Sequence, residues 1–295
     1  MRRCSNAPND GDVMSDYSAW IGREVRREDQ IDWSLAMRWL ATFNRVPLGN
    51  GTMPQGFHWC LCTPDAPTNA LGADGHPSRD ESPSSFLPPV PLPRRMWASS
   101  KVEFLNPMRI DDPVTRTSRV HSITEKQGGS GRLVFVEIDH ETLSAGELAV
   151  RERQSLVYRA AAPPEAPPVP PEIGAGRFDP EGWDVYRSLI PDEALLFRFS
   201  ALTFNSHRIH YDLPYARDVE RYRGLVVHGP LTATLLLDFA RITLGDNAIK
   251  SFAFRGVSPA ICGEMLHLVL RSKDAAWELG AYAADGRQVM SATAG

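Results

Sequence analysis

A proline-rich run divides this chain of 295 residues into two halves of similar length. Residues 160–171 read Ala-Ala-Ala-Pro-Pro-Glu-Ala-Pro-Pro-Val-Pro-Pro. Because proline lacks a backbone N–H and its ring fixes φ, this run cannot enter a helix or the interior of a sheet. It is predicted to be an extended connector of the polyproline type. We therefore expect two folded units, residues 16–160 and 177–295, joined by a linker at 161–176.

The two halves resemble each other at an offset of 150 residues. Val102–Pro107, followed by Asp112–Val114, resembles Phe252–Val257, followed by Cys262–Glu264. Segments of alternating apolar and polar character then predict strands in the same order in each half. These segments are 115–123, 133–141 and 149–158 in the first half, and 265–271, 277–283 and 288–293 in the second. The pattern predicts an internal duplication.

The second half carries one strong helix signal ahead of its strands. Gly229–Ile242 is apolar nearly all round, which predicts a buried helix rather than a surface one. A buried helix followed by antiparallel strands indicates an α+β unit in which a curved sheet wraps one helix. In the first half the corresponding segment, Phe57–Leu61, is short, and 63–93 is rich in Pro, Gly, Ser and Asp. We expect that half to have a degenerate central helix, which leaves room inside the fold, and a long loop that covers a site.

Composition excludes several classes of protein. A net charge of −4 argues against a nucleic-acid-binding surface. Four cysteines make no disulfide framework, and Cys60-Leu61-Cys62 has no second pair with which to complete a zinc site. The basic N-terminus lacks a following apolar segment, and no apolar run is long enough to span a membrane. The sequence therefore predicts a cytoplasmic protein with disorder up to about residue 15.

The candidate catalytic side chains are concentrated between residues 204 and 232. Phe204–Asp212 contains histidine, amide and carboxylate groups, and Val227–Thr232 places a His-Gly pair at the start of the predicted helix. A side-chain base near a helix N-terminus suits chemistry on a thioester, because the free N–H groups there can hold a developing enolate oxygen. This spacing predicts an active site for proton transfer.

Each motif residue has a functional and a structural interpretation. His210 is predicted to be the general base or acid. The alternative is a core histidine that is hydrogen-bonded to the backbone. Asn205 cannot transfer a proton, but it can orient water or fix the tautomer of His210; otherwise it only forms a turn. Gly229 is predicted to bind an oxyanion through its backbone N–H. The alternative is that glycine is there only to allow close packing of the helix against the sheet. Asp212 is predicted to cap a helix rather than to act as an acid.

Other polar residues are candidate substrate contacts. His207, Arg208, Tyr211 and His228 lie in or next to the motif, and for His207 and Arg208 a solvent-facing role is equally open. Arg94, Arg95 and Arg255 are candidates for phosphate or carboxylate groups of a substrate, although each alone also suits an ordinary surface charge.

Together these motifs resemble the double hotdog fold of the MaoC-like hydratase/dehydratase superfamily. Its motif is Asp-x-Asn-Pro-apolar-His with a later His-Gly pair, matched here by Ile209-His210 and His228-Gly229. The chain departs from it with Asn at 205 for Asp, His at 207 for Asn and Arg at 208 for Pro.

One branch of the superfamily is similar throughout. Thr203–Asp212, together with Trp20–Arg23 and Phe86–Ala98 in the first half, resembles the branch of mesaconyl-C4-CoA and itaconyl-CoA hydratases and mitochondrial-type 3-hydroxyacyl-thioester dehydratases. The resemblance covers about Trp20 to Thr293.

The resemblance implies reversible hydration of an enoyl-CoA, with mesaconyl-C4-CoA or itaconyl-CoA going to citramalyl-CoA. It implies no metal or redox cofactor, since the CoA thioester is the substrate. A 3-hydroxyacyl-thioester dehydratase of fatty-acid or polyketide synthesis is the alternative, and a thioesterase or a non-catalytic acyl-CoA-binding protein are further ones. Two hotdog units already form a pseudo-dimer, so a homodimer is plausible but not required.

Overall fold

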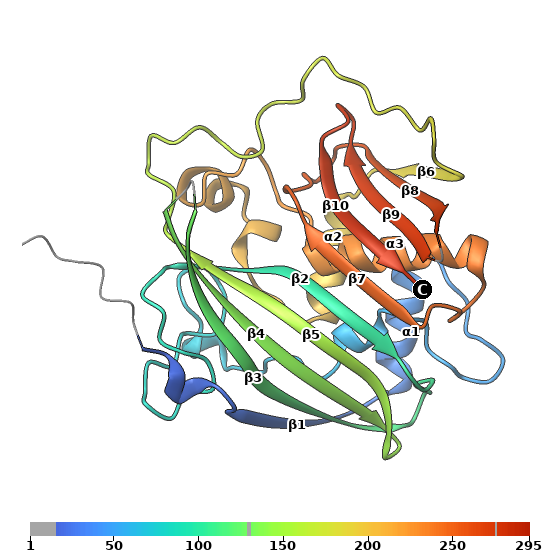
Figure 1. Ribbon diagram of the computed structural model, residues 1–295, viewed down its shortest axis with the longest axis horizontal. Coiled ribbons are helices and arrows are strands. Elements are labelled where there is room, and N and C mark those ends of the chain that lie inside the picture. The colour runs from blue at the N-terminus through green and yellow to red at the C-terminus, as the bar shows by residue number, and fades with distance from the viewer. Residues whose placement is uncertain (1–15, 129–130, 275) are drawn as a thin grey trace, which may run out of the picture.

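All the strands of the computed structural model belong to one antiparallel sheet, within the residues that it describes, 16–128, 131–274 and 276–295. The predicted N-terminal disorder lies outside these residues. The strand order is β1-β3-β4-β5-β2-β7-β10-β9-β8-β6. The first half therefore supplies one side of the sheet and the second half the other (Figure 1).

The first half contains all its predicted strands and several further elements. Its elements are η1 (Ser18–Trp20), β1 (Glu24–Gln30), α1 (Trp33–Thr42), η2 (Phe57–Cys60), η3 (Thr68–Ala70), β2 (Arg94–Phe104), β3 (Pro113–Gly128), β4 (Gly131–Ser144) and β5 (Glu147–Arg159). The strand β1 and the helix α1 were not predicted from the sequence.

The second half repeats this order around a longer helix. Its elements are β6 (Val185–Leu189), α2 (Glu193–Leu202), η4 (Arg208–His210), η5 (Tyr215–Val219), α3 (Gly229–Leu244), β7 (Ser251–Gly256), β8 (Leu266–Lys273), β9 (Ala276–Ala283) and β10 (Gln288–Ala294). The predicted buried helix is confirmed as α3, whose Leu231, Leu236 and Phe239 are at most 1% exposed.

The duplication extends further than the sequence comparison indicated. Strands β2 and β7 pair with each other at the centre of the sheet, and from this seam outward the two halves have the same strand order. At the two outer ends, β1 leads into α1 and β6 leads into α2. Both helices start from an aspartate cap, where Asp32 accepts from the N–H of Leu35 and Asp192 from that of Leu195.

The halves share one hydrophobic core. Trp39 of α1, Phe199 of α2 and Phe239 of α3 lie in the same buried cluster, with Phe57 of η2 and Phe252 of β7. Burying the large side chains of both halves together gives the halves a common interior, in addition to a smaller apolar cluster within the first half.

The first half has a short 3₁₀ helix where the second has α3. Its η2 is four residues long, and the loop after it contributes Val90 and Leu92 to a cluster with Val120, Val134 and Tyr158 of the sheet. The loop therefore covers part of the sheet that a longer central helix would otherwise cover. The degenerate helix and the long loop were both predicted.

The proline-rich segment after β5 forms neither helix nor strand over 160–176. It runs along the outside of the molecule toward β6 (Figure 1). One isolated bridge joins Val169 to Tyr222, and Pro170 next to it is buried. Among the described residues, no helix is both long and apolar enough to cross a membrane.

Candidate active site

The fold brings the two parts of the histidine motif together. After α2 the chain turns at Phe204, whose φ is 47°, and passes through η4 to His210. The rings of His210 and His228 stack with centroids 3.5 Å apart and an interplanar angle of 19°. Both side chains are buried. The predicted base therefore lies against the residue that precedes the first turn of α3.

His210 is held in one tautomer by the backbone. Its Nδ1 lies 2.7 Å from the carbonyl oxygen of Val226, which can only accept, so Nδ1 carries the proton and Nε2 keeps a lone pair. Burial lowers the pKa of His210 well below its ordinary value, and His228 and His207 lower it further. The ring is therefore neutral at physiological pH, which is the state that a general base requires.

The N-terminus of α3 is open toward this ring. Gly229 is the first residue of the helix, Pro230 follows it, and a Cβ at Gly229 would meet no atom within 4 Å. In the described part of the chain, no acceptor takes the N–H of Gly229. A helix N-terminus favours negative charge, so this N–H is suited to a thioester oxygen.

His228 is fixed as a structural neighbour of the base. Its Nε2 lies 2.8 Å from Oγ of Ser200 on α2, while its buried Nδ1 has no partner among the described residues. Burial lowers the pKa of His228 to about 3. A neutral ring stacked on His210 restricts how that imidazole can rotate.

Asn205 does not perform one of its two predicted roles. Its Oδ1 accepts from the N–H of His207 at 3.0 Å, so its oxygen is used in a local turn. The carbonyl of Val226, and not Asn205, fixes the tautomer of His210. The expectation that Asn205 sets this tautomer is corrected for that reason, while its amide N–H groups are still available to orient water.

His207 and Arg94 are both committed to one carboxylate. His207 Nε2 lies 2.9 Å from Oε1 of Glu220, and Arg94 donates to the carbonyl oxygen of Glu220 at 2.7 Å. Burial raises the pKa of Glu220, but His207 and Arg94 outweigh it and the pKa is lowered overall. Neither side chain is therefore free for substrate in this arrangement, although both had been predicted as substrate contacts.

The end of the motif is a capped turn. Asp212 accepts from the N–H of Tyr215 at 3.1 Å and from two nitrogens of Arg208 at 2.9 and 2.7 Å. These contacts lower the pKa of Asp212, and the N–H of Tyr215 has the largest effect. The predicted capping role of Asp212 is confirmed, and Arg208 serves the same turn while lying over the ring of Tyr215. Tyr211 beside them is 53% exposed.

The two other predicted arginines differ from each other. Arg255 is exposed on β7. Arg95 is half-buried on β2, has no hydrogen-bond or ion-pair partner among the described residues, and lies near enough to His76 to lower the pKa of that ring. Of the three arginines, Arg95 is therefore the one placed beside the histidines and still available to an anion.

The loop of the first half docks on the motif, as its predicted covering role requires. Ser206 donates to the carbonyl oxygen of Gly75 at 2.6 Å, and the N–H of Arg208 donates to that of Asp74 at 2.9 Å. Gly75 has a φ of 87°, and a Cβ there would lie 2.0 Å from the carbonyl oxygen of Ser206. Only glycine fits this approach.

The docked loop adds residues that the sequence did not identify. The ring of His76 lies 4.1 Å from that of His207, and His76 Nδ1 lies 3.1 Å from Oδ2 of Asp74. The rings of His207 and His210 are 5.5 Å apart, so both halves contribute to one cluster of histidines. The sole sequence signal was Asp-Gly-His inside a polar loop, which predicts a turn and nothing more.

A cavity lies where the first half lacks its long helix. It has a volume of about 120 Å³, lies beside η2 between the two halves, and is lined by Met53, Gly56, His58, Phe104, Met108, Val150, Ile249 and six neighbours, with Lys250 among its polar residues. None of the predicted site residues lines this cavity, so the room expected from the degenerate helix stays a prediction.

This fold and site define the class of the protein as a hotdog hydratase/dehydratase, and known proteins agree. HtdX of Mycobacterium tuberculosis matches with a TM-score of 0.64 at 17% identity, covering 92% of this chain and 99% of that one. A second M. tuberculosis protein, described as having a double hotdog fold, matches with a TM-score of 0.56 at 14% identity over 93% and 95%. These likenesses show that the fold is the double hotdog.

Sequence comparison shows the family. The family described as hydroxyacyl-thioester dehydratase type 2 matches residues 56–262. The mesaconyl-C(4)-CoA hydratase of Chloroflexus aurantiacus is 40% identical over 282 residues, which are 95% of this chain and 97% of that protein. The chain belongs to the hydroxyacyl-thioester dehydratase type 2 family and is a hydro-lyase.

Proposed function

We propose that the chain catalyses reversible hydration of an enoyl-CoA with a branched C5 dicarboxylic acyl group, either mesaconyl-C4-CoA or itaconyl-CoA going to citramalyl-CoA. The similarity to the Chloroflexus hydratase along nearly the whole chain supports this substrate class. Hydration as the type of reaction is supported by His210, which is neutral, held in one orientation and beside the N-terminus of α3.

The site residues divide the reaction as follows. Nε2 of His210 takes a proton from water while the water oxygen forms a bond to the β-carbon. The π electrons of the enoyl group move toward the thioester oxygen, which accepts from the N–H of Gly229 as it gains charge. The protonated His210 then returns the proton to the α-carbon, so water is added across the double bond. The reverse sequence is dehydration.

Two further residues position the reactants. The amide N–H groups of Asn205 orient the attacking water, since its oxygen is engaged by His207. Arg95 binds the free carboxylate of the acyl group, since it is half-buried near the histidines and has no ion-pair partner among the described residues. A guanidinium suits a carboxylate because it can donate two parallel hydrogen bonds.

Dehydration of a 3-hydroxyacyl thioester is the second candidate, and the family match favours it. It uses the same base and the same helix N-terminus, and it differs in having no carboxylate to bind. A cytoplasmic location and assembly into a homodimer complete the proposal, and sedimentation of the purified chain tests the second of these.

A substrate comparison tests this function. Purified protein is assayed with mesaconyl-C4-CoA and with crotonyl-CoA, by loss of enoyl-thioester absorbance and by the mass of the hydrated product. We expect preference for mesaconyl-C4-CoA and a loss of about 10²–10⁴-fold in kcat for His210→Ala, as removal of a general base implies. Arg95→Gln should reduce the preference rather than the rate on crotonyl-CoA.

The control is His121→Ala, which removes a histidine from β3 that is paired with Asp139 outside the site. It should turn over substrate at the wild-type rate. An unchanged rate in His210→Ala would place the base elsewhere. Preference for crotonyl-CoA in the wild-type protein would favour the dehydratase of unbranched substrates.

A further inference from the structure

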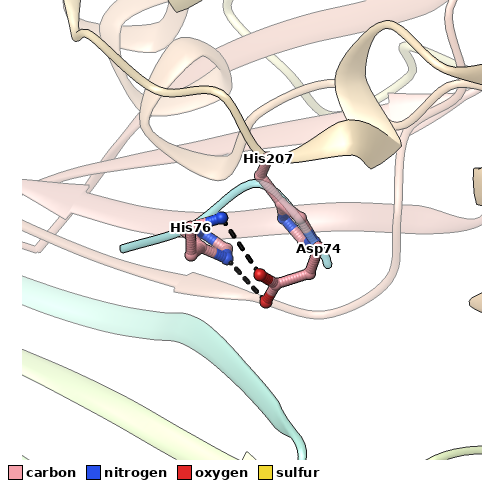
Figure 2. Close-up of side chains that lie close together, drawn as sticks. All are labelled: Asp74, His76 and His207. Atoms are coloured by element: carbon pink, nitrogen blue, oxygen red, sulfur yellow. Dashed lines mark hydrogen bonds and ion pairs between the residues drawn. The ribbon is translucent and has the colours of Figure 1, made fainter. Parts of the chain in front are cut away.

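Three potential metal ligands converge where the first-half loop meets the motif. One ligand atom each from Asp74, His76 and His207 lies within 4.8 Å of the other two. Figure 2 shows the three side chains gathered together, with dashed lines joining Asp74 and His76. The two histidines belong to different halves of the chain, so the group exists only because the halves dock.

This convergence is held in place on both sides. Gly75 lies between Asp74 and His76, and its close approach to Ser206 fixes the two flanking side chains against the motif. On the other side, Glu220 holds the ring of His207 at 2.9 Å. The backbone between Asp74 and His76 and the ring of His207 are therefore held by contacts outside the group, while the side chains of Asp74 and His76 bond to each other, as in a preorganised binding site.

We propose that Asp74, His76 and His207 bind one divalent transition-metal cation, with Zn²⁺ as the best match. Two imidazoles and a carboxylate are ligands that Zn²⁺ accepts, whereas Mg²⁺ and Ca²⁺ prefer oxygen alone. Tetrahedral ligands about 2.0–2.2 Å from Zn²⁺ lie about 3.3–3.6 Å from each other. His76 Nδ1 and Asp74 Oδ2 are 3.1 Å apart and share a hydrogen bond, so a bound ion would replace the shared proton and separate the two atoms slightly.

Glu220 supplies the outer contact that such a site needs. Donation from Nε2 of His207 to Glu220 leaves Nδ1 of His207 with the lone pair. A ligating histidine whose second nitrogen donates to a carboxylate is a recurring feature of metal sites, because it fixes the tautomer and orients the ring. Arg94 in turn holds Glu220 through the carbonyl oxygen of that residue.

Exposure leaves one coordination position accessible. The side chains of Asp74 and His76 are 36% and 24% exposed, while His207 is buried behind them. Three protein ligands therefore leave the fourth position of a tetrahedral ion open to water. The ion joins the loop of the first half to the motif of the second and takes no part in the proton transfer at His210, so this inference is independent of the proposed function.

Metal titration of the full chain, without an affinity tag, tests the proposal. Chelator-treated protein is titrated with ZnCl₂ by calorimetry and with CoCl₂ by visible absorption, in the absence of substrate. We expect one ion per chain, a tetrahedral Co²⁺ spectrum and a rise in melting temperature with Zn²⁺. His76→Ala and Asp74→Asn should each weaken binding at least tenfold and abolish the rise.

Matched variants show whether the ion binds at these three side chains. His121→Ala, which breaks an exposed histidine–carboxylate pair with a 3.0 Å contact, should leave the affinity unchanged. Glu220→Gln should weaken binding about 10–100-fold while the three ligands remain. His76→Gln keeps a polar side chain of similar length and is the control for misfolding of His76→Ala. It should lose metal binding as His76→Ala does.

Three results would overturn the proposal. These are the absence of stoichiometric binding, binding that His76→Ala and Asp74→Asn do not weaken, and a thiolate-to-metal absorption band that assigns the ion to cysteine. In the first case the three side chains serve only as a hydrogen-bonded contact between the halves. The hydratase assay is unaffected by any of these outcomes.

Discussion

The two halves of this molecule build the same strand order around helices of very different length. In the second half a curved sheet packs on the sixteen residues of α3. In the first half the strands β3, β4 and β5 are longer, yet they face a four-residue η2 and a loop. The second half thus keeps a helix N-terminus for chemistry, while the first uses the freed space for a loop that reaches across to it.

The buried polar groups of the halves also differ. In the first half Glu152 is buried, with its Oε2 3.6 Å from Nε2 of His58 and its Oε1 2.5 Å from Oγ of Ser100. In the second half His210 and His228 stack without a carboxylate between them. The first half therefore buries a carboxylate within its core, whereas in the second half the buried carboxylate, Glu220, pairs with His207 and leaves His210 as a neutral imidazole ready to accept a proton.

Removing each half's buried carboxylate should separate these roles most strongly. Glu152→Ala removes the acceptor that Ser100 and Trp59 share and the 3.6 Å ion-pair partner of His58, so we expect a loss of about 3–5 kcal/mol in the free energy of unfolding. Glu220→Ala should cost less stability and more activity, because Glu220 holds His207 beside the base. Urea denaturation and steady-state kinetics measure the two effects, and equal losses of stability would contradict the distinction.

The pH dependence of stability should show the effect of His140, a half-buried histidine of the first half. Burial lowers the pKa of His140 to about 4, from an ordinary value of 6.5. Below pH 6.5 the unfolded chain gains a proton that the folded chain does not, so stability falls between pH 6.5 and 4.

We expect this histidine to account for a loss of on the order of 2–3 kcal/mol. His140→Gln should recover that amount relative to the wild type by pH 4, and it should show no pH-dependent difference from it above pH 7. Parallel stability curves for the two proteins across this range would show that His140 is not the group responsible.

A smaller effect should follow from undocking the loop. Gly75→Ala places a Cβ against the carbonyl oxygen of Ser206, so the loop must move and the motif with it. A displacement of about 1 Å at a site costs up to 10²-fold, so we expect kcat/KM to fall about 10–100-fold.

Gly146→Ala is the matched control for this substitution. Gly146 has nearly the same φ, 86°, and a Cβ there would meet no atom within 4 Å. Both variants carry the same backbone strain, so only the contact with Ser206 distinguishes them. Similar kinetics in the two variants would mean that loop docking does not position the motif.

Local patterns predicted those parts of the fold that follow from periodicity. The alternation of the central strands and the apolar character of Gly229–Ile242 were sufficient to place them. Strand β1 was missed because Glu24–Gln30 is an edge strand of mostly charged residues. Helix α1 was missed although Asp32 caps it and Ala36, Trp39 and Leu40 have helical spacing.

The candidate site divides in the same way. His210, His228 and Gly229 are near in sequence, and a motif placed them together. Asp74 and His76 reach the site through a contact between Gly75 and Ser206, 131 residues apart, which depends on how the halves dock. The repeat contains one more similarity that could have indicated α1. The same tripeptide, Thr-Phe-Asn, lies at the end of α1 (42–44) and at the end of α2 (203–205).

The pairing of β2 with β7 has a consequence for how the enzyme behaves on dilution. Two separate chains that met along such a seam would part at low concentration, and a site built from both would come apart with them. Here the 160–176 segment joins the partners covalently, so the encounter is intramolecular and its effective concentration is fixed by the tether. The seam, and the histidine cluster that depends on it, should therefore stay assembled however scarce the protein is.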